Sequence, residues 1–222
     1  MKKVLLSFLL LGSFIANSQI SVTNPGKRVL REITLTGTGY ELGLQHGTIL
    51  KKEIAEIVTK WKQNTTTSLG KDANQVVKDF FNYAHFDDAI KKWTPDLYEE
   101  VSGIAAGSQQ AFNDIIVLNL LDEFWVYLNN IANHHCSGIG VPAVNGGTAY
   151  IAQNMDIESY TDGYQILLRL IKNGTQPEQL ILTHPGLIVL NGMNEMGVGA
   201  CMKKEPGITS IKCRIENQIR CL

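Results

Sequence analysis

The stretch HHCSGIGVPAVNGGTAYIAQNMDIE, residues 134–158, holds the only cysteine among the first 200 residues, with an aspartate twenty positions beyond it. Two short runs typical of β-strands, SGIGV and TAYIAQNM, flank the turn signal at residues 145–147. The pattern predicts a β-hairpin. Cys136 is then either a small buried hydrophobe or a thiol held beside a carboxylate.

The length of the hairpin loop decides which residues face each other. If residues 145–147 form a three-residue loop with a glycine in the left-handed region, the numbers of paired residues sum to 292. This register places Cys136 directly opposite Asp156, with the two β-carbons roughly 4.5 to 5.5 Å apart. A slip of one residue at Pro142 would turn Asp156 to the other face.

The chemistry of Cys136 depends on a base, because a thiol with a pKa of about 8.5 is only slightly ionised at neutral pH. His134 and His135 precede it, but neighbours on an extended chain point to opposite sides, so at most one shares its face. Alternatively, Cys136 becomes the first residue of a processed chain, and its α-amine, with a pKa of about 7.7 to 8.0, acts as the base. A nearby carboxylate would then orient that amine.

The rest of the chain divides into a helical part, residues 19–135, and a strand-rich part, residues 136–222. With 222 residues, 44% of them hydrophobic, the chain suits one globular domain. The apolar spacing predicts a strand at 28–36, then helices from about 50 to the polar run at 64–70, over 74–93, from Thr94-Pro95 onward, and over 113–130. Five short β-like runs follow residue 137, including LIVLNGM, and predict an antiparallel sheet.

Residues 1–18 have the pattern of a secretory signal peptide, with two lysines before a short apolar run. Removing them leaves 18 basic residues against 21 acidic ones, a balance that does not indicate a nucleic-acid partner. We therefore expect an extracytoplasmic protein, periplasmic or secreted, with no membrane association after signal cleavage.

The four cysteines and the histidines also raise the question of disulfides and metals. Cys201, Cys213 and Cys221 lie in the last 22 residues, and export would allow disulfides among them, with the pairing open. A metal-binding module of His134, His135, Cys136 and His184 is an alternative from another class. Its consecutive ligands diverge on an extended chain, so we predict no metal and no cofactor.

Several segments together resemble a known family. They are ELGLQHG at 41–47, NLLDEF at 119–124, Cys136, AQNMD at 152–156 and LNGMNEMGVGAC at 190–201. In this order they are similar to the acyl-coenzyme A:6-aminopenicillanic acid acyltransferase family, peptidase family C45, of self-processing N-terminal-nucleophile hydrolases. The resemblance covers most of residues 30–202.

The resemblance implies an α+β fold, the four-layer αββα sandwich, and self-cleavage between His135 and Cys136 into two pieces that stay associated. Cys136 would be the nucleophile that attacks an amide or thioester of a small molecule, which in a transfer reaction is an acyl donor. Asp156 would orient the new α-amine. Gln153 and Asn154 would lie beside the substrate pocket.

The C-terminal segment departs from the family pattern. Family members continue beyond the position of Cys201, whereas residues 202–222 form a basic stretch without the expected strand. We expect an atypical tail from about residue 203, a shortened or frame-shifted reading frame, and a sandwich that is incomplete in this chain. The rival to an active enzyme is therefore an inactive fragment of the same fold.

Overall fold

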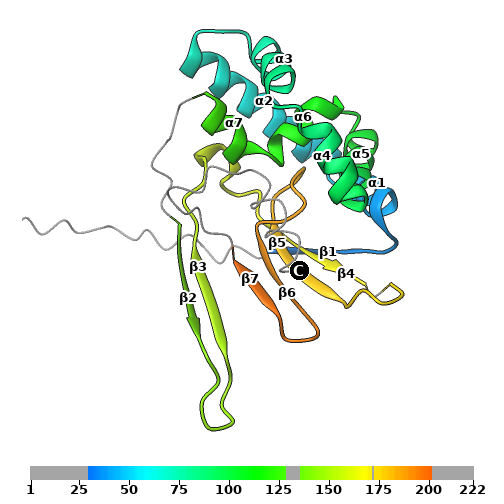
Figure 1. Cartoon of the computed structure of the whole chain (residues 1–222), viewed down its shortest axis with the longest axis vertical. Helices are drawn as coiled ribbons and strands as arrows, with labels where there is room; N and C mark the ends of the chain where they lie inside the picture. Colours follow the sequence, from blue (N-terminus) through cyan, green and yellow to red (C-terminus); the bar gives the residue numbers. More distant parts are fainter. Residues whose placement is uncertain (1–29, 129–135, 172, 202–222) are drawn as a thin grey trace, which may run out of the picture.

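A layer of helices covers one face of a mixed β-sheet, and a separate hairpin extends away from the body (Figure 1). The computed structural model describes residues 30–128, 136–171 and 173–201. The predicted signal peptide, His134, His135 and the tail from about residue 203 lie outside the described residues. The domain limits predicted at these positions therefore stay predictions.

The helical layer comes almost entirely from the part of the chain before Cys136. Its helices are α1 (Gly39–Ile49), α2 (Lys51–Leu69), α3 (Ala73–Ala84), α4 (Phe86–Trp93), α5 (Pro95–Ser108), α6 (Phe112–Leu118) and α7 (Leu121–Tyr127), and a 3-10 turn, η1 (Ser159–Thr161), follows later. The predicted apolar stripe of α2 is buried from Leu50 to Trp61, and α5 begins at Pro95 as predicted. The sequence thus predicted that this half is helical and where two of its helices lie.

Helix α1 was not predicted as a helix, because its sequence is rich in glycine. The glycines allow α1 to approach α5 closely, since a Cβ at Gly43 or Gly47 would overlap backbone atoms of α5. The first turn of α1 is also capped, because the Glu41 carboxylate accepts a hydrogen bond from the Thr38 backbone N–H at 3.2 Å. Close packing against α5 therefore stabilises α1 despite the low helix propensity of glycine.

Two predicted helices were wrong, because each is broken into two. The helix predicted over 74–93 breaks at His85, which has φ 47°. The helix predicted over 113–130 breaks after α6, where the Asn119 side chain donates to the Gly186 carbonyl and accepts from the Ile188 N–H, both at 2.9 Å. Helix α2 ends at the polar run as predicted, at Leu69, with Gly70 at φ 62° as its C-cap.

The sheet has the strand order β1-β4-β5-β6-β7, and β2 and β3 form the separate hairpin. The strands are β1 (Arg31–Leu35), β2 (Ser137–Val141), β3 (Tyr150–Asn154), β4 (Ile166–Leu170), β5 (Gln179–Thr183), β6 (Asn191–Asn194) and β7 (Gly199–Cys201). All neighbouring strands pair antiparallel except β1, which is parallel to β4. The predicted antiparallel sheet is therefore confirmed except at β1, and the segment 187–190 precedes β6 instead of belonging to it.

The core lies between the helical layer and the inner face of the sheet. Trp61, Phe80 and Phe124 are fully buried there, with the rings of Phe80 and Phe124 in edge contact at a centroid distance of 5.4 Å. Ile33 of β1 and Leu168 of β4 cover the sheet side of the same cluster. The α and β content of the predicted fold class is confirmed, while the four-layer αββα sandwich stays a prediction.

Candidate functional site

The turn of the β2–β3 hairpin is a two-residue turn at Asn145-Gly146. Asn145 has φ 51° and Gly146 has φ 77°, and the Gly147 N–H donates to the Val144 carbonyl at 2.9 Å. Positive φ at both central residues is characteristic of a type I′ turn, for which Asn-Gly is the preferred pair. The predicted loop of three residues was therefore one residue too long.

The shorter loop shifts the hairpin register by one residue. Ser137 pairs with Asn154 and Gly138 pairs with Gln153, so the numbers of paired residues sum to 291 instead of 292. The predicted direct pairing of Cys136 with Asp156 is therefore wrong. The sequence contained the necessary signal, because Asn-Gly favours a two-residue loop over a three-residue one.

The two predicted catalytic residues lie on opposite faces of the hairpin when this register is continued by one residue beyond β2. Alternation places Cys136 on the face of Gly138 and Gln153. Asp156 falls on the face of Asn154, whose Nδ2 lies 3.4 Å from the Asp156 Oδ1. Cys136 is half-buried, whereas Asp156 is exposed.

The face that carries Gln153 meets β6 and β7. The Asn191 Nδ2 donates to the Gln153 Oε1 at 3.0 Å and lies 3.6 Å from the Met155 Sδ. A Cβ at Gly138 would lie 3.2 Å from the Cys201 Sγ, so this part of β2 passes close to β7. The end of the hairpin face that carries Cys136 thus contacts a polar side chain and lies near a second thiol.

Asn191 was not singled out by its sequence position, although it lies within the LNGMNEMGVGAC segment. It stands next to Gly192, where a Cβ would come within 2.8 Å of the Leu180 carbonyl oxygen, and it begins β6. The signal in the sequence is the Asn191-Gly192 pair, because the glycine allows the close strand packing that brings the neighbouring asparagine to the hairpin. The predicted pocket residues Gln153 and Asn154 point to different faces, and Gln153 is the one in contact with Asn191.

Cys136 and Cys201 are both half-buried and carry free thiols. Cys213 and Cys221 lie outside the described residues, so the disulfide pairing of the C-terminal cysteines stays open. For the described residues, no group of three or more His, Cys, Asp or Glu side chains is arranged to hold a metal ion.

Two histidines of the described chain, His46 and His184, are buried. His46 is fully buried, and its Nε2 accepts a hydrogen bond from the Gly186 N–H at 3.0 Å. Burial, together with the nearby His184, lowers the pKa of His46 to about 3. Burial also lowers the pKa of His184, whose Nδ1 lies 3.3 Å from the Pro185 carbonyl oxygen. Both rings therefore stay neutral in the folded protein at neutral pH.

Fold and hairpin together define a mixed α and β protein with a half-buried cysteine directly before the first strand of a hairpin. The chain is 30% identical, over 176 residues, to the acyl-coenzyme A:6-aminopenicillanic-acid-acyltransferase 40 kDa form of Emericella nidulans, an alignment that covers 75% of this chain and 44% of that protein. This match confirms the predicted family: the chain is related to the acyl-coenzyme A:6-aminopenicillanic acid acyltransferases. It spans less than half the length of this relative. No protein-family model matches the chain.

Within the described ranges, no helix combines the length and the apolar character needed to cross a bilayer.

Proposed function

We propose that the chain is a cysteine N-terminal-nucleophile amidohydrolase or acyltransferase that processes itself before Cys136. The relationship to a protein named as an acyltransferase is the observation that carries this proposal. The position of Cys136 supports it, since a half-buried thiol directly before a hairpin strand is held by the backbone and stays partly accessible. The substrate would be a small molecule with an amide or thioester bond, and in a transfer reaction an acyl donor.

The processing step is an acyl shift from nitrogen to sulfur. The Cys136 thiol attacks the carbonyl carbon of His135, the C–N bond breaks, and a thioester forms while the proton of the thiol passes to the nitrogen, which leaves as a free amine. Water then hydrolyses the thioester, which leaves a carboxylate on His135 and frees both the thiol and the α-amine of Cys136. The free amine has a pKa near neutrality and serves as the base for the next acyl transfer.

Asp156 keeps its proposed role of orienting that amine, although its side chain does not face the thiol. The amine belongs to the main chain of Cys136, and main-chain groups lie in the plane of the hairpin, within reach from either face. Asp156 lies one residue beyond the position opposite Cys136. This offset turns the Asp156 carboxylate away from the Cys136 sulfur but is compatible with a contact between the carboxylate and the Cys136 main-chain nitrogen.

The polar pair of Gln153 and Asn191 is proposed to lie beside the acyl group of the substrate. Gln153 belongs to the hairpin face that Cys136 continues, and Asn191 of β6 contacts that face through its hydrogen bond of 3.0 Å to Gln153. An amide N–H at this place could donate to a carbonyl oxygen on which negative charge develops during attack. The extracytoplasmic location expected from residues 1–18 completes the proposal, and two cleaved pieces would stay associated through the core shared by helices and sheet.

The experiment is to express the chain, determine intact masses by mass spectrometry and sequence every N-terminus. A new fragment that begins at Cys136, absent in Cys136→Ala, is the expected result. Cys201→Ala is the matched control, because Cys201 is the other half-buried free thiol of the described chain and should leave cleavage unchanged. Hydrolysis of a small thioester by the cleaved chain should disappear in Cys136→Ala.

Two results would contradict the proposal. An uncut chain that hydrolyses amides or thioesters at full rate would exclude the self-processing mechanism. An uncut chain with no such activity would identify this polypeptide as the inactive form of the fold.

A further inference from the structure

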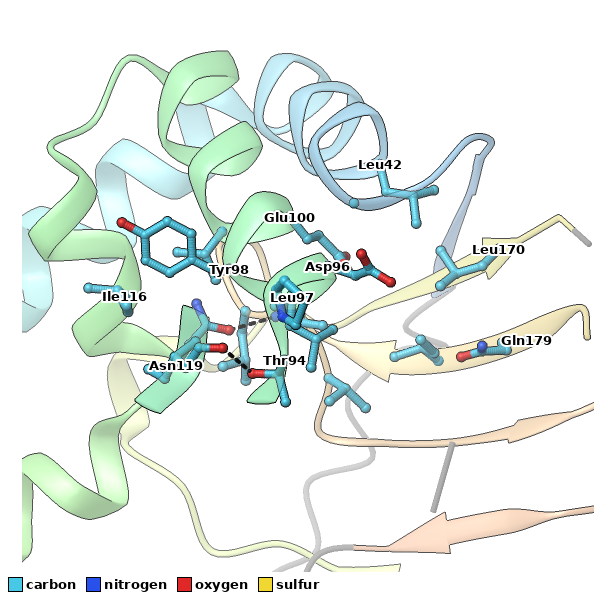
Figure 2. Close-up of a pocket in the computed structure, with 18 of the residues that line it drawn as sticks. Leu42, Thr94, Asp96, Leu97, Tyr98, Glu100, Ile116, Asn119, Leu170 and Gln179 are labelled. Carbon is cyan, nitrogen blue, oxygen red and sulfur yellow. Dashed lines mark hydrogen bonds between the residues drawn. The ribbon is translucent and has the colours of Figure 1, made fainter. Parts of the chain in front are cut away.

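A cavity of about 500 Å³ lies between the helical layer and the sheet (Figure 2). Residues of α1, α4, α5 and α6 form one wall, and the ends of β4 and β5 with the segment 187–189 form the other. None of the residues that line it belongs to the β2–β3 hairpin. Cavities of this volume commonly hold small organic molecules, so this is a candidate site separate from Cys136.

The lining of the cavity is largely aliphatic. Its apolar side chains include Leu42, Ile90, Val101, Ile116, Ile181 and Ile188. Among the described residues that line it, the charged ones are Asp96 and Glu100, and no Lys, Arg or His is present. These two acidic residues are one helical turn apart on α5, and Figure 2 shows both on the same side of that helix. An anionic ligand would therefore lose its hydration without finding a positively charged side chain in the lining.

Glu100 is the unusual residue of this site. It is only 5% exposed, and burial is the sole cause of its raised pKa, with no contribution from a hydrogen bond or a charge of a described residue. Burial raises the pKa of Glu100 to about 8. A buried carboxylate without a partner is costly, so the group is mostly protonated at neutral pH while the cavity is empty.

We propose that this cavity binds a small molecule that joins an ammonium group to an apolar body. The ammonium group would lie against Glu100, with Asp96 near the mouth, and the apolar body would fill the aliphatic part of the cavity. The rings of Trp93 and Tyr98 also line the site, but each already has a lysine ammonium over it, Lys92 at 5.0 Å and Lys91 at 4.8 Å from the ring centroids, so Glu100 is the group proposed to hold the cation. The proposal does not depend on the chemistry proposed for Cys136.

The test uses three probes with the same apolar body: 4-phenylbutylamine, 4-phenylbutan-1-ol and 4-phenylbutanoate. Isothermal titration calorimetry of the full chain at pH 7 should show that the amine binds at least about tenfold more tightly than the alcohol, the gain expected for a charged hydrogen bond. The acid should bind more weakly than the alcohol. Titrations in buffers of different ionisation enthalpy should show proton release with the amine, because Glu100 must ionise to pair with it.

Glu100→Gln is the decisive variant, because it keeps the shape of the side chain and removes the charge. It should bind the alcohol as the wild type does, which shows that the cavity is intact, and it should lose both the preference for the amine and the proton release. Asp96→Asn is the matched control on the same helix and should retain most of the preference, since Asp96 is exposed. Equal binding of amine and alcohol by the wild type, or an unchanged amine preference in Glu100→Gln, would overturn the proposal.

Discussion

Gly43 of α1 lies against the backbone carbonyl of Glu100 in α5, so closely that a Cβ at Gly43 would overlap that oxygen. The approach is mutual, because a Cβ at Gly103 of α5 would overlap the Tyr40 carbonyl oxygen of α1. This crossing fixes the backbone that carries Glu100, and with it the wall of the cavity. The glycine-rich helix α1, whose composition resembles that of a loop, thus helps to position the buried carboxyl group of Glu100.

Gly43→Ala should therefore destabilise the protein even though alanine is the better helix former. Overpacking costs roughly 1 to 3 kcal/mol, and overlap with a backbone atom puts Gly43 at the upper end of this range. Against a gain of about 1 kcal/mol in helix propensity, we expect a net loss of about 2 kcal/mol. Urea denaturation followed by circular dichroism measures it. Gly140→Ala is the control, because a Cβ at Gly140 of β2 has nothing within 4 Å. Equal losses in both variants would show that the helix crossing is looser than described.

The hairpin register should depend on Gly146, the second residue of the type I′ turn. Gly146→Ala places a β-carbon at φ 77°, which costs roughly 1 to 2 kcal/mol for an L-residue. Amide hydrogen exchange in the β2–β3 ladder, read at Gln153, should become about tenfold faster, as a free-energy loss of about 1.4 kcal/mol requires. Asn145→Gly is the control, since glycine also accepts the φ of 51° at that position. Unchanged exchange in Gly146→Ala would show that the turn does not hold the ladder.

The hairpin also shows where sequence reasoning succeeds and where it stops. The alternation of SGIGV and TAYIAQNM predicted both strands, but the register depended on whether Asn145-Gly146 alone forms the loop. An error of one residue exchanges the faces of a strand, so Cys136 and Asp156 separate although both strands are correct.

The helical half shows a different limit. The apolar stripe of α2 is visible in sequence because burial repeats with the helical period. The glycines of α1 pack against α5, a partner about 60 residues away, which local periodicity does not reveal. For the same reason the sequence did not indicate the cavity at Glu100, which forms between elements that are distant in the chain.

His46 should make the protein less stable in mild acid. Its pKa is lowered from 6.5 to about 3 in the folded state, so below pH 6.5 the unfolded chain binds a proton that the folded chain does not. The stability contributed by neutral His46 is complete above pH 6.5 and decreases as the pH falls toward 3. From pH 6.5 to pH 5 the loss should be about 2 kcal/mol.

Urea denaturation at pH 7 and pH 5, for the wild type and His46→Gln, measures this loss. Glutamine can still accept a hydrogen bond from the Gly186 N–H but does not titrate. The variant should show a smaller decrease in stability between the two pH values. The same decrease in both proteins would assign the acid sensitivity to other groups, among them His184, whose pKa burial also lowers.

Glu100 should have the opposite effect on the alkaline side. Burial raises its pKa from 4.5 to about 8, so between these values the folded chain holds a proton that the unfolded chain has released. The contribution of Glu100 to the free energy of unfolding is therefore largest below pH 4.5 and falls as the pH rises toward 8, with a slope of up to about 1.4 kcal/mol per pH unit.

The window from pH 6.5 to 8 separates the effect of Glu100 on stability from that of His46. Urea denaturation across the window should show a falling free energy of unfolding for the wild type and a flatter one for Glu100→Gln. Addition of 4-phenylbutylamine at pH 8 should restore part of the wild-type stability and leave Glu100→Gln nearly unchanged, because the ammonium group supplies the partner that the buried carboxylate otherwise lacks. A wild-type slope equal to that of Glu100→Gln would mean that the carboxyl group reaches solvent and titrates as an ordinary glutamate.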